Sequence, residues 1–472
     1  MSATLLARAA ATPFPLPTPD FTAAAAKSTA LAVPRLAFID VGWRKLPYLL
    51  ALRERLQAQL DGVFFTRRRL LRQLISDAGA PLFPQARAPQ ATYAIGDDEL
   101  REALGAKLAR RYDDAGLQKA RQRLAELEAF LVGERIDVIF VWNGYNKLCS
   151  SLAIFLARRH GLRVIFGEHG YLPGTMQLDA LGVNQLSSAT AEVQAGRAWL
   201  PPQAELDARV DAFIRLHRAR QPRADRVAVP AVLRGQWRTR TELRLREVFR
   251  QRRLRLLQAL YTRSLPQTLP ALPERFVLLP LQVRSDSQLQ MHSPVFGNDL
   301  LRVIQRLRSA LREIDPSLRL VVKLHPRENP KQQIIYGELT QRMPDVLFTL
   351  GHPLPALLDA AAAVVTINST VGFEAMLYDK PVIALGRNFY VAPGLVETVK
   401  HESELPTALR LALATPPDAT LRRGFLRWVC AQFLVDGVYD DFSERSLAAT
   451  AARILALSCA PLELAEPIAR AA

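Results

Sequence analysis

Short apolar runs alternate with stretches of helical periodicity along most of this chain. In its first half, the apolar runs are LAFIDVG from Leu36, GVFFT, IDVIFVWN from Ile136, and residues 162–166. Between them, residues 46–60, residues 117–132 and SSLAIFLARRHG repeat apolar positions at helical spacing, and Gly161 ends the last of these helices. The alternation predicts a doubly wound α/β domain, with Glu168 and His169 directly after its last strand.

The second half repeats this alternation after a basic segment. RFVLLPLQV, LRLVVKLHPRENP and VLFTL are predicted strands, whereas NDLLRVIQRLRSALREI, HPLPALLDAAA and residues from about 414 to 457 are predicted helices. The expected units are a disordered Ala- and Pro-rich leader at 1–34, a Rossmann-like domain at 35–200, a basic helical insertion at 201–270, a second Rossmann-like domain at 271–413 and helices at 414–472. By analogy, this is the GT-B arrangement of glycosyltransferases: α/β, with two Rossmann-like domains facing a cleft and C-terminal helices crossing back.

Residues 362–390, AAVVTINSTVGFEAMLYDKPVIALGRNFY, form the most informative unit. A buried strand leads into the polar turn Asn368-Ser369-Thr370, and a helix and a second strand follow. Such a turn lies at the carboxyl end of its strand, where the free N–H groups of the next helix can bind an anion. Ser369 and Thr370 would equally serve as a plain helix cap with no ligand, and the local pattern leaves both readings open.

Composition limits the class of protein. The chain has 472 residues, 49% of them hydrophobic, and no apolar run long enough to predict a transmembrane helix. The cysteines Cys149, Cys430 and Cys459 are far apart and lack metal-ligand spacing, which is typical of reduced thiols and favours a cytoplasmic location.

A net charge of +17 indicates an anionic partner. The basic excess is concentrated in residues 215–263, from Arg215 to Arg263, where leucines, Val248 and Phe249 recur among arginines and predict a cationic amphipathic helix. Three readings stay open: peripheral contact with the anionic cytoplasmic face of the inner membrane, an interdomain helix with a solvated arginine face, and nucleic-acid binding, which is the least favoured.

Four segments together resemble a known family. EHGYLPGTMQLDALGVN, PLQVRSDSQ, VVKLHPRENP and NSTVGFEAMLYDKPVIALGRNFY are similar, in this order, to the motifs of the bacterial capsular-polysaccharide synthesis family. Its characterised members are retaining β-Kdo transferases that use CMP-Kdo as donor, where Kdo is an acidic keto-sugar. The resemblance covers about residues 136–184 and 276–390, and it implies the same reaction on a glycan or glycolipid acceptor in capsule or lipopolysaccharide synthesis.

The resemblance also implies roles for two carboxylates. Asp286 would be the nucleophile that forms a glycosyl-enzyme adduct, and Glu168, across the cleft, would be the general base toward the acceptor hydroxyl. The simpler readings are that Asp286 caps a helix or turn and that Glu168 is a surface residue. Two further hypotheses remain: a transferase of another CMP- or UDP-activated sugar, and a non-catalytic binder of anionic surfaces.

The remaining site residues follow from the chemistry of the leaving group. CMP carries its negative charge as the bond breaks, and His325, Ser369 and Thr370 are suited to neutralising it, with charge added by Lys323 or Arg327. The full expected donor set is Lys323, Pro326, Arg327, Asn368, Ser369, Thr370, Gly372 and Glu374, with Glu374 on the ribose hydroxyls. Further substrate contacts are expected from His169, Gln282, Arg284, Gln288 and His292. No DxD-type metal motif is evident, so neither a metal nor a cofactor is expected.

Overall fold

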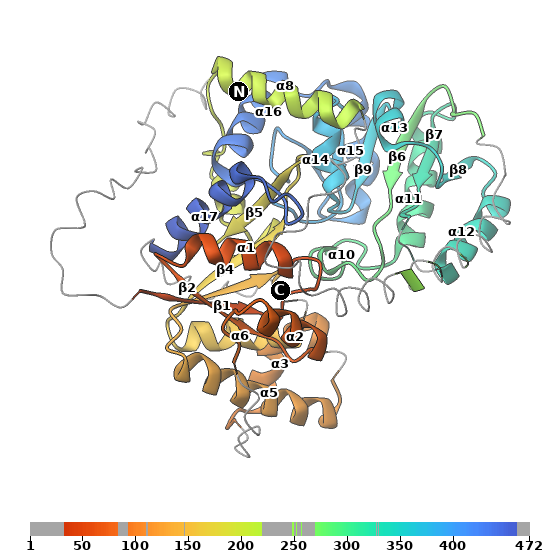
Figure 1. Cartoon of the computed structure of the whole chain (residues 1–472). Helices are drawn as coiled ribbons and strands as arrows, with labels where there is room; N and C mark the ends of the chain where they lie inside the picture. The colour runs from red at the N-terminus through yellow and green to blue at the C-terminus, as the bar shows by residue number, and fades with distance from the viewer. Residues whose placement is uncertain are drawn as a thin grey trace.

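The computed structural model describes residues 33–83, 93–109, 112–145, 147–219, 248–249, 252, 256, 270–326, 328 and 330–459. In these residues the chain forms two six-stranded sheets, each flanked by helices (Figure 1). The predicted leader and most of the predicted basic insertion lie outside the described residues. The α/β prediction is confirmed.

The first sheet has the order β12-β5-β4-β3-β1-β2. Its parallel part consists of β1 (Arg35–Ile39), β2 (Asp61–Phe65), β3 (Val138–Trp142) and β4 (Arg163–His169). The helices of this domain are α1 (Leu46–Leu56), α2 (Arg69–Asp77), α3 (Asp97–Leu104), α4 (Ala106–Ala109), α5 (Asp114–Gly133) and α6 (Leu148–Arg159). Gly161, at φ +65°, follows α6 as expected, because glycine adopts this left-handed conformation without strain.

The end of β4 differs from the prediction. The strand continues through Glu168 and His169, because β5 (Thr175–Asp179) pairs with it antiparallel and places Glu168 opposite Gln177. The sequence pattern ended this strand at residue 166 and contained no hairpin. Polar side chains near a strand end do not terminate the strand where a neighbouring strand satisfies its backbone groups.

The second sheet, β11-β10-β9-β6-β7-β8, is parallel throughout. Its strands are β6 (Phe276–Pro280), β7 (Arg319–Lys323), β8 (Val346–Thr349), β9 (Ala363–Thr366), β10 (Val382–Ala384) and β11 (Glu397–Thr398). Its helices are α10 (Ser287–Met291), α11 (Leu300–Ile314), α12 (Pro330–Arg342), α13 (Leu354–Ala360), α14 (Thr370–Met376) and α15 (Leu405–Ala414). Numbered within this domain, the order is 3-2-1-4-5-6, that of a Rossmann fold.

The C-terminal segment returns to the first domain. After α16 (Ala419–Trp428) and the π-helical turn Val429–Phe433, β12 (Leu434–Asp436) pairs antiparallel with β5, and α17 (Glu444–Cys459) packs beside α1 (Figure 1). The buried Tyr48 hydroxyl lies 2.7 Å from Oγ1 of Thr450, fixing α17 on α1. The crossing predicted by analogy is confirmed, although the segment also contains a strand that the sequence reading did not include. The two domains and this crossing define the GT-B architecture.

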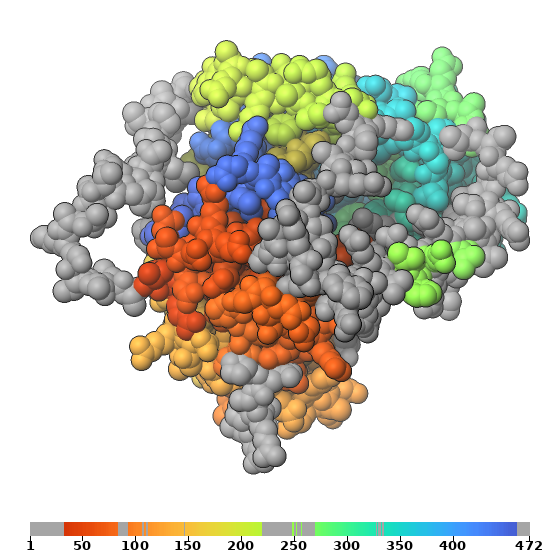
Figure 2. Space-filling model, in the orientation of Figure 1, coloured from red at the N-terminus to blue at the C-terminus, as the bar shows by residue number. Residues whose placement is uncertain are grey.

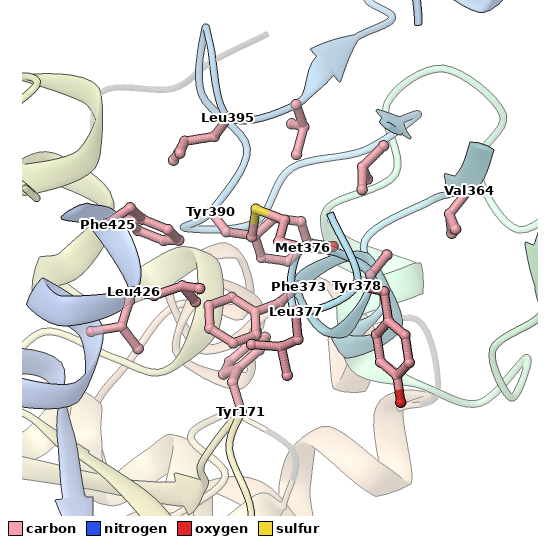
Figure 3. Close-up of a cluster of buried hydrophobic side chains, with 14 of the residues drawn as sticks. Tyr171, Val364, Phe373, Met376, Leu377, Tyr378, Tyr390, Leu395, Phe425 and Leu426 are labelled. Carbon is pink, nitrogen blue, oxygen red and sulfur yellow. The ribbon is translucent and has the colours of Figure 1, made fainter. Parts of the chain in front are cut away.

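Helix α8 (Ala204–Ala219) spans the top of the molecule over the C-terminal helices, shown in yellow-green in Figure 2. Arg423 and Arg427 of α16 both bind Asp207 of α8, at 2.7 and 2.8 Å. The interdomain core lies beneath, where Tyr171 of the first domain meets Phe373 of α14 (Figure 3). This shared apolar cluster joins the two domains.

Candidate active site

In the second sheet the strand order reverses between β6 and β9. Open α/β sheets bind ligands at the carboxyl ends of the strands at such a point, because the connections diverge there and leave a crevice. Two buried amides bridge it: Gln282, after β6, donates from Nε2 to Oδ1 of Asn368, after β9, at 2.9 Å. The segments Ser285-Asp286-Ser287 and Asn368-Ser369-Thr370 therefore converge on this end of the sheet.

Asp286 begins the short helix α10 beside this crevice. Its Oδ1 accepts a hydrogen bond from the Gln288 backbone N–H at 2.9 Å, so the capping role foreseen as the simpler reading is present. Buried Glu328 fixes the preceding loop by accepting from the Arg284 backbone N–H at 2.9 Å, and Gln290 donates to the Arg284 carbonyl oxygen at 3.0 Å. The helix-capping hydrogen bond uses Oδ1 of Asp286. Capping by this oxygen is therefore compatible with a chemical role for the other carboxylate oxygen, Oδ2.

Glu168 lies near the end of β4 in the first domain. Its Oε1 accepts from the His169 backbone N–H at 2.8 Å. Burial raises the pKa of the carboxyl from 4.5 to about 7; the His169 hydrogen bond and the positive charge of Lys45 lower the pKa, and the negative charge of Asp286 raises it. A carboxyl with a pKa raised in this way is a stronger base than an ordinary carboxylate and is suited to accept a proton.

The two carboxylates belong to different domains, and the negative charge of Asp286 contributes to the raised pKa of Glu168. Tyr171 lies within the field of both: burial raises the pKa of its phenol well above the usual value, and Glu168 and Asp286 add to that rise. Its hydroxyl lies 2.7 Å from Oδ1 of Asn184 and 3.0 Å from Oδ1 of Asn388. Carboxylates from separate domains thus share one polar environment.

Lys45 approaches the same environment from the start of α1. Its Nζ lies 4.6 Å from the centre of the Trp142 ring and 4.7 Å from that of the Tyr439 ring, both cation–π distances. The edge of His169 packs against the same two rings. Burial lowers the pKa of Lys45, and the Glu168 charge partly restores it. An aromatic enclosure therefore holds a cation beside Glu168.

The predicted donor turn begins α14 and is largely bonded within the protein. Ser369 accepts from the Val371 backbone N–H at 3.2 Å, which is the helix-capping reading. Thr370 donates to Oε1 of Glu374 at 3.1 Å, and Oε2 of Glu374 lies 2.8 Å from Nε2 of His217 on α8. Glu374 thus has protein partners on both oxygens, and a ribose contact would require the pair with His217 to open.

Gly372 has a packing reason for being glycine. A Cβ atom at this position would lie 2.4 Å from Oη of Tyr390 and 2.7 Å from Cγ2 of Thr366. The Tyr390 hydroxyl donates to the Ser369 carbonyl oxygen at 2.5 Å, so it cannot move away freely. The motif glycine allows the helix to approach the aromatic core, and its donor-binding role stays a prediction.

The segment His325-Pro326 follows β7 on the same edge of the sheet. Lys323 donates from Nζ to the Leu350 carbonyl oxygen at 2.5 Å, which directs its charge into the protein. His325 is partly buried and Pro326 is exposed at the carboxyl end of this strand. Arg327 lies outside the described residues. The structure thus brings His325 and Pro326 to the strand edge, and their contact with phosphate stays a prediction.

Several buried polar atoms around α10 have no hydrogen-bond partner among the described residues. They are Oε1 of Gln288, Nε of Arg284, Nε2 of His292 and Oγ of Ser293. Burial lowers the pKa of His292 to about 4, with the Arg387 charge adding to the effect, so its ring is neutral at pH 7. Buried atoms of this kind are costly unless something binds them, which favours a polar ligand near α10.

A small pocket that opens to solvent lies between the domains. The first domain supplies the turn after β3, the Phe166 ring and residues 182–186, and α10 supplies Ser287, Gln288 and Met291. Asn143 and Gly144 have consecutive positive φ angles of 64° and 53°, in the left-handed region that asparagine and glycine adopt more readily than other residues. This turn and the Asp286 helix thus line one space.

Three residues of this site were missed by sequence reasoning: Lys45, Tyr171 and Asn388. Tyr171 and Asn388 lie inside recognised motifs, but no local pattern distinguishes a bridging phenol or amide from a core residue. Lys45 follows a strand end, and that position was its only available signal. Neither a cluster of three or more metal-ligating side chains nor a helix with the length and apolar character to cross a membrane is found in the described part of the chain.

Comparison with known proteins agrees with the motifs. The family model described as capsule polysaccharide biosynthesis protein matches residues 138–439, more than half of the chain. The chain therefore belongs to the capsule polysaccharide biosynthesis family, which confirms the resemblance drawn from its four segments.

Individual relatives are similar over shorter stretches. Protein FixF of Sinorhizobium fredii is 30% identical over 304 residues, covering 64% of this chain and 61% of FixF. Capsule polysaccharide export protein KpsS of Escherichia coli is 33% identical over 195 residues, covering 40% of this chain and 48% of KpsS. The matches thus span less than two thirds of these relatives. Among solved structures, Thermosulfurimonas dismutans KpsC, described as a beta Kdo 2,7 transferase, aligns with 90% of this chain and 99% of its own at 13% identity, with a TM-score of 0.44.

Proposed function

We propose that the protein is a retaining glycosyltransferase that transfers Kdo from CMP-Kdo to a glycan or glycolipid acceptor in capsule or lipopolysaccharide synthesis. The observation that supports the proposal is that Glu168 of the first domain has a pKa raised to about 7 and lies within the electrostatic influence of Asp286 of the second domain. Membership of the capsule polysaccharide biosynthesis family supports the pathway. The likeness of the SDS, LHP and NST motifs to β-Kdo transferases supports the donor.

In the proposed first step, Asp286 attacks the anomeric carbon of Kdo. A bond forms from its carboxylate oxygen to that carbon, the bond from the carbon to the phosphate oxygen breaks, and CMP leaves with the electron pair. The Gln288 backbone N–H donates to Oδ1 of Asp286 and so orients the carboxylate. The polar atoms around α10 that lack a hydrogen-bond partner among the described residues would bind groups of the donor.

In the second step, the acceptor hydroxyl attacks the same carbon while Glu168 takes its proton. The bond to Asp286 breaks, and the carboxylate returns to its starting state. Two inversions give overall retention of configuration. The raised pKa of Glu168 makes it a stronger base than an ordinary carboxylate, and the enclosure of the site holds it near the incoming hydroxyl.

Release of CMP from CMP-Kdo, with a Kdo-terminated acceptor present, tests this proposal. The wild-type protein should release CMP, and Asp286→Ala should abolish release while the circular-dichroism spectrum stays unchanged. Asp418→Ala, which removes the capping carboxylate of α16, is a matched control that should retain activity. Absence of CMP release with every Kdo-terminated acceptor tried would contradict the proposal.

A further inference from the structure

A continuous chain of buried hydrogen bonds begins beside Glu168 in the first domain. The carbonyl oxygen of His169 accepts from Nε2 of Gln177 at 2.7 Å. Oε1 of Gln177 accepts from the Asn184 backbone N–H at 3.0 Å, and Nε2 lies 3.1 Å from Oδ1 of Asn184. Asn184 has φ +55°, so its backbone is held in a conformation that few side chains favour. Its Oδ1 then meets the Tyr171 hydroxyl at 2.7 Å.

This series of hydrogen bonds continues in the second domain as far as α10, the helix that Asp286 caps. From Tyr171 it passes to Oδ1 of Asn388, at 3.0 Å, and Nδ2 of Asn388 donates to the Asn368 carbonyl oxygen at 2.9 Å. Nδ2 of Asn368 donates to the carbonyl oxygens of Gln288 and His292 at 2.8 and 3.1 Å. These two carbonyls belong to α10 and its C-terminal end. The same helix begins at Asp286.

We propose that Tyr171 is a positioning residue whose hydroxyl fixes the separation of Glu168 and Asp286 across the domain boundary. The inference rests on the proposed function for the roles of the two carboxylates. It adds that their spacing is set by the Tyr171 phenol and by the amides of Asn184 and Asn388, none of which is among the residues expected to bind the donor.

Apolar packing alone would not set this spacing. Tyr171 packs edge-on against the ring of Phe373, at a centroid distance of 5.3 Å (Figure 3). It packs in the same way against the ring of Phe389, at 4.8 Å. Such contacts favour an edge-to-face arrangement but accept a broad range of ring separations, whereas hydrogen bonds in a dry interior restrict both distance and angle more narrowly. Burial raises the pKa of Tyr171 far above neutrality, so the hydroxyl remains a donor at physiological pH. Its single proton is shared between two amide oxygens, one from each domain.

The matched control is Tyr48. It is also a buried phenol, and its hydroxyl lies 2.7 Å from Oγ1 of Thr450 and 3.1 Å from Oγ of Ser446, between α1 and α17. Tyr48→Phe removes comparable hydrogen bonds away from the junction between Glu168 and Asp286. Tyr171→Phe keeps the ring in its aromatic cluster, and Asn184→Gly removes the amide while still permitting a positive φ.

Distances between spin labels test the positioning directly, without requiring activity. Labels are placed through Gln122→Cys on α5 and Glu313→Cys on α11, both exposed, in a Cys459→Ser background. Burial raises the pKa of the Cys149 and Cys430 thiols to about 12, so these cysteines react slowly with the label. Wild type and Tyr48→Phe should give one narrow distance distribution, and Tyr171→Phe and Asn184→Gly should broaden or shift it.

Kinetics of CMP release supply the second readout. Tyr171→Phe should lower kcat about 10- to 100-fold while the donor KM changes less than about threefold, because misplacement affects the reacting geometry more than donor binding. A label distribution for Tyr171→Phe that overlays the wild type overturns the proposal, as does a broadened distribution with unchanged kcat. An inactive wild type refutes the proposed function instead, and the spin-label distances still decide whether Tyr171 positions the domains.

Discussion

At the scale of single residues, the environment of Glu168 explains both its proposed chemistry and a cost to stability. Burial favours its protonated form, and among the described residues Lys45 is the cation that lowers its pKa. The folded protein therefore holds this proton more tightly than the unfolded chain does. Between pH 4.5 and about 7 the unfolded state loses its proton first, and the free energy of unfolding falls as the pH rises.

Glu168→Gln should therefore raise stability at alkaline pH. The amide cannot ionise, so the variant should gain about 1 to 3 kcal/mol at pH 8 and little at pH 4. Thermal unfolding at both pH values measures the difference, and the variant should lack CMP release. Glu192→Gln is a control for which the opposite change in stability is expected. The hydrogen bond with Arg197 lowers the pKa of the Glu192 carboxyl, so this variant should lose stability at pH 8 relative to pH 4. An equal gain in the stability of Glu168→Gln at pH 4 and pH 8 would refute the proposed dependence of stability on the ionisation of Glu168.

Lys45 should set the pH at which Glu168 becomes active. Its positive charge lowers the Glu168 pKa, so Lys45→Met should raise it and move the acid limb of kcat/KM to higher pH by about 0.5 to 1 unit. Methionine keeps an apolar contact with the Trp142 and Tyr439 rings. Arg44→Met, which removes a charge at the neighbouring exposed position, should move the limb less. An unchanged limb in Lys45→Met would mean that Glu168 is not the titrating base.

At the scale of secondary-structure elements, Asp286 has two separable tasks. It caps α10 through Oδ1, and the proposed chemistry uses its nucleophilic carboxylate. Asparagine retains the capping oxygen but is a poor nucleophile, whereas alanine retains neither property.

Asp286→Asn and Asp286→Ala should therefore be equally inactive but differently stable. Asp286→Ala should lose about 0.5 to 2 kcal/mol relative to Asp286→Asn, because only the alanine leaves the helix uncapped. Urea unfolding of both variants beside the wild type measures the difference. Asp418→Ala and Asp418→Asn, at the cap of α16, form a matched pair remote from the site. Retention of catalysis in Asp286→Asn would remove the residue from the proposed mechanism.

Most elements could be predicted from the sequence because their periodicity is strong. The strand at Val138–Trp142 is apolar throughout, and α11 shows a regular apolar face. The strand β12 could not be predicted, because three residues acquire strand pairing only from a partner more than 250 residues earlier in the chain. The extension of β4 through Glu168 depends likewise on β5, which the pattern did not reveal.

The site was predictable as a set of strand-end residues but not as a set of contacts. Parallel topology brings the segments after β6 and β9 together, and Nδ2 of Asn368 donates to the Gln288 carbonyl oxygen. The Glu374 carboxylate, expected on the ribose hydroxyls, lies 2.8 Å from Nε2 of His217. This contact depends on the packing of α8 on α14. Tyr171 and Asn388 form their hydrogen bond through the meeting of two domains, which no local pattern encodes.

At the scale of the whole molecule, the C-terminal crossing joins the domains while leaving a pocket between them. One wall of this pocket belongs to each domain, so a ligand that contacts both should stabilise the folded chain. CMP should raise the melting temperature more than UDP at equal concentration if the donor is CMP-activated. The Asn368→Ala variant, which loses the amide bridge to Gln282 and to α10, should respond less. A larger shift with UDP would favour a transferase of another sugar on the same scaffold.

The central claim is that Asp286 becomes covalently bonded to the donor sugar. Intact-protein mass spectrometry after incubation with CMP-Kdo, without acceptor, tests it most directly. We expect one added Kdo on the wild type, carried by the peptide that contains Asp286 and removed when acceptor is supplied. Asp286→Asn should show no adduct. An adduct that persists in Asp286→Asn, or CMP release by the wild type with no trapped sugar under any condition, would contradict a glycosyl-enzyme on this residue.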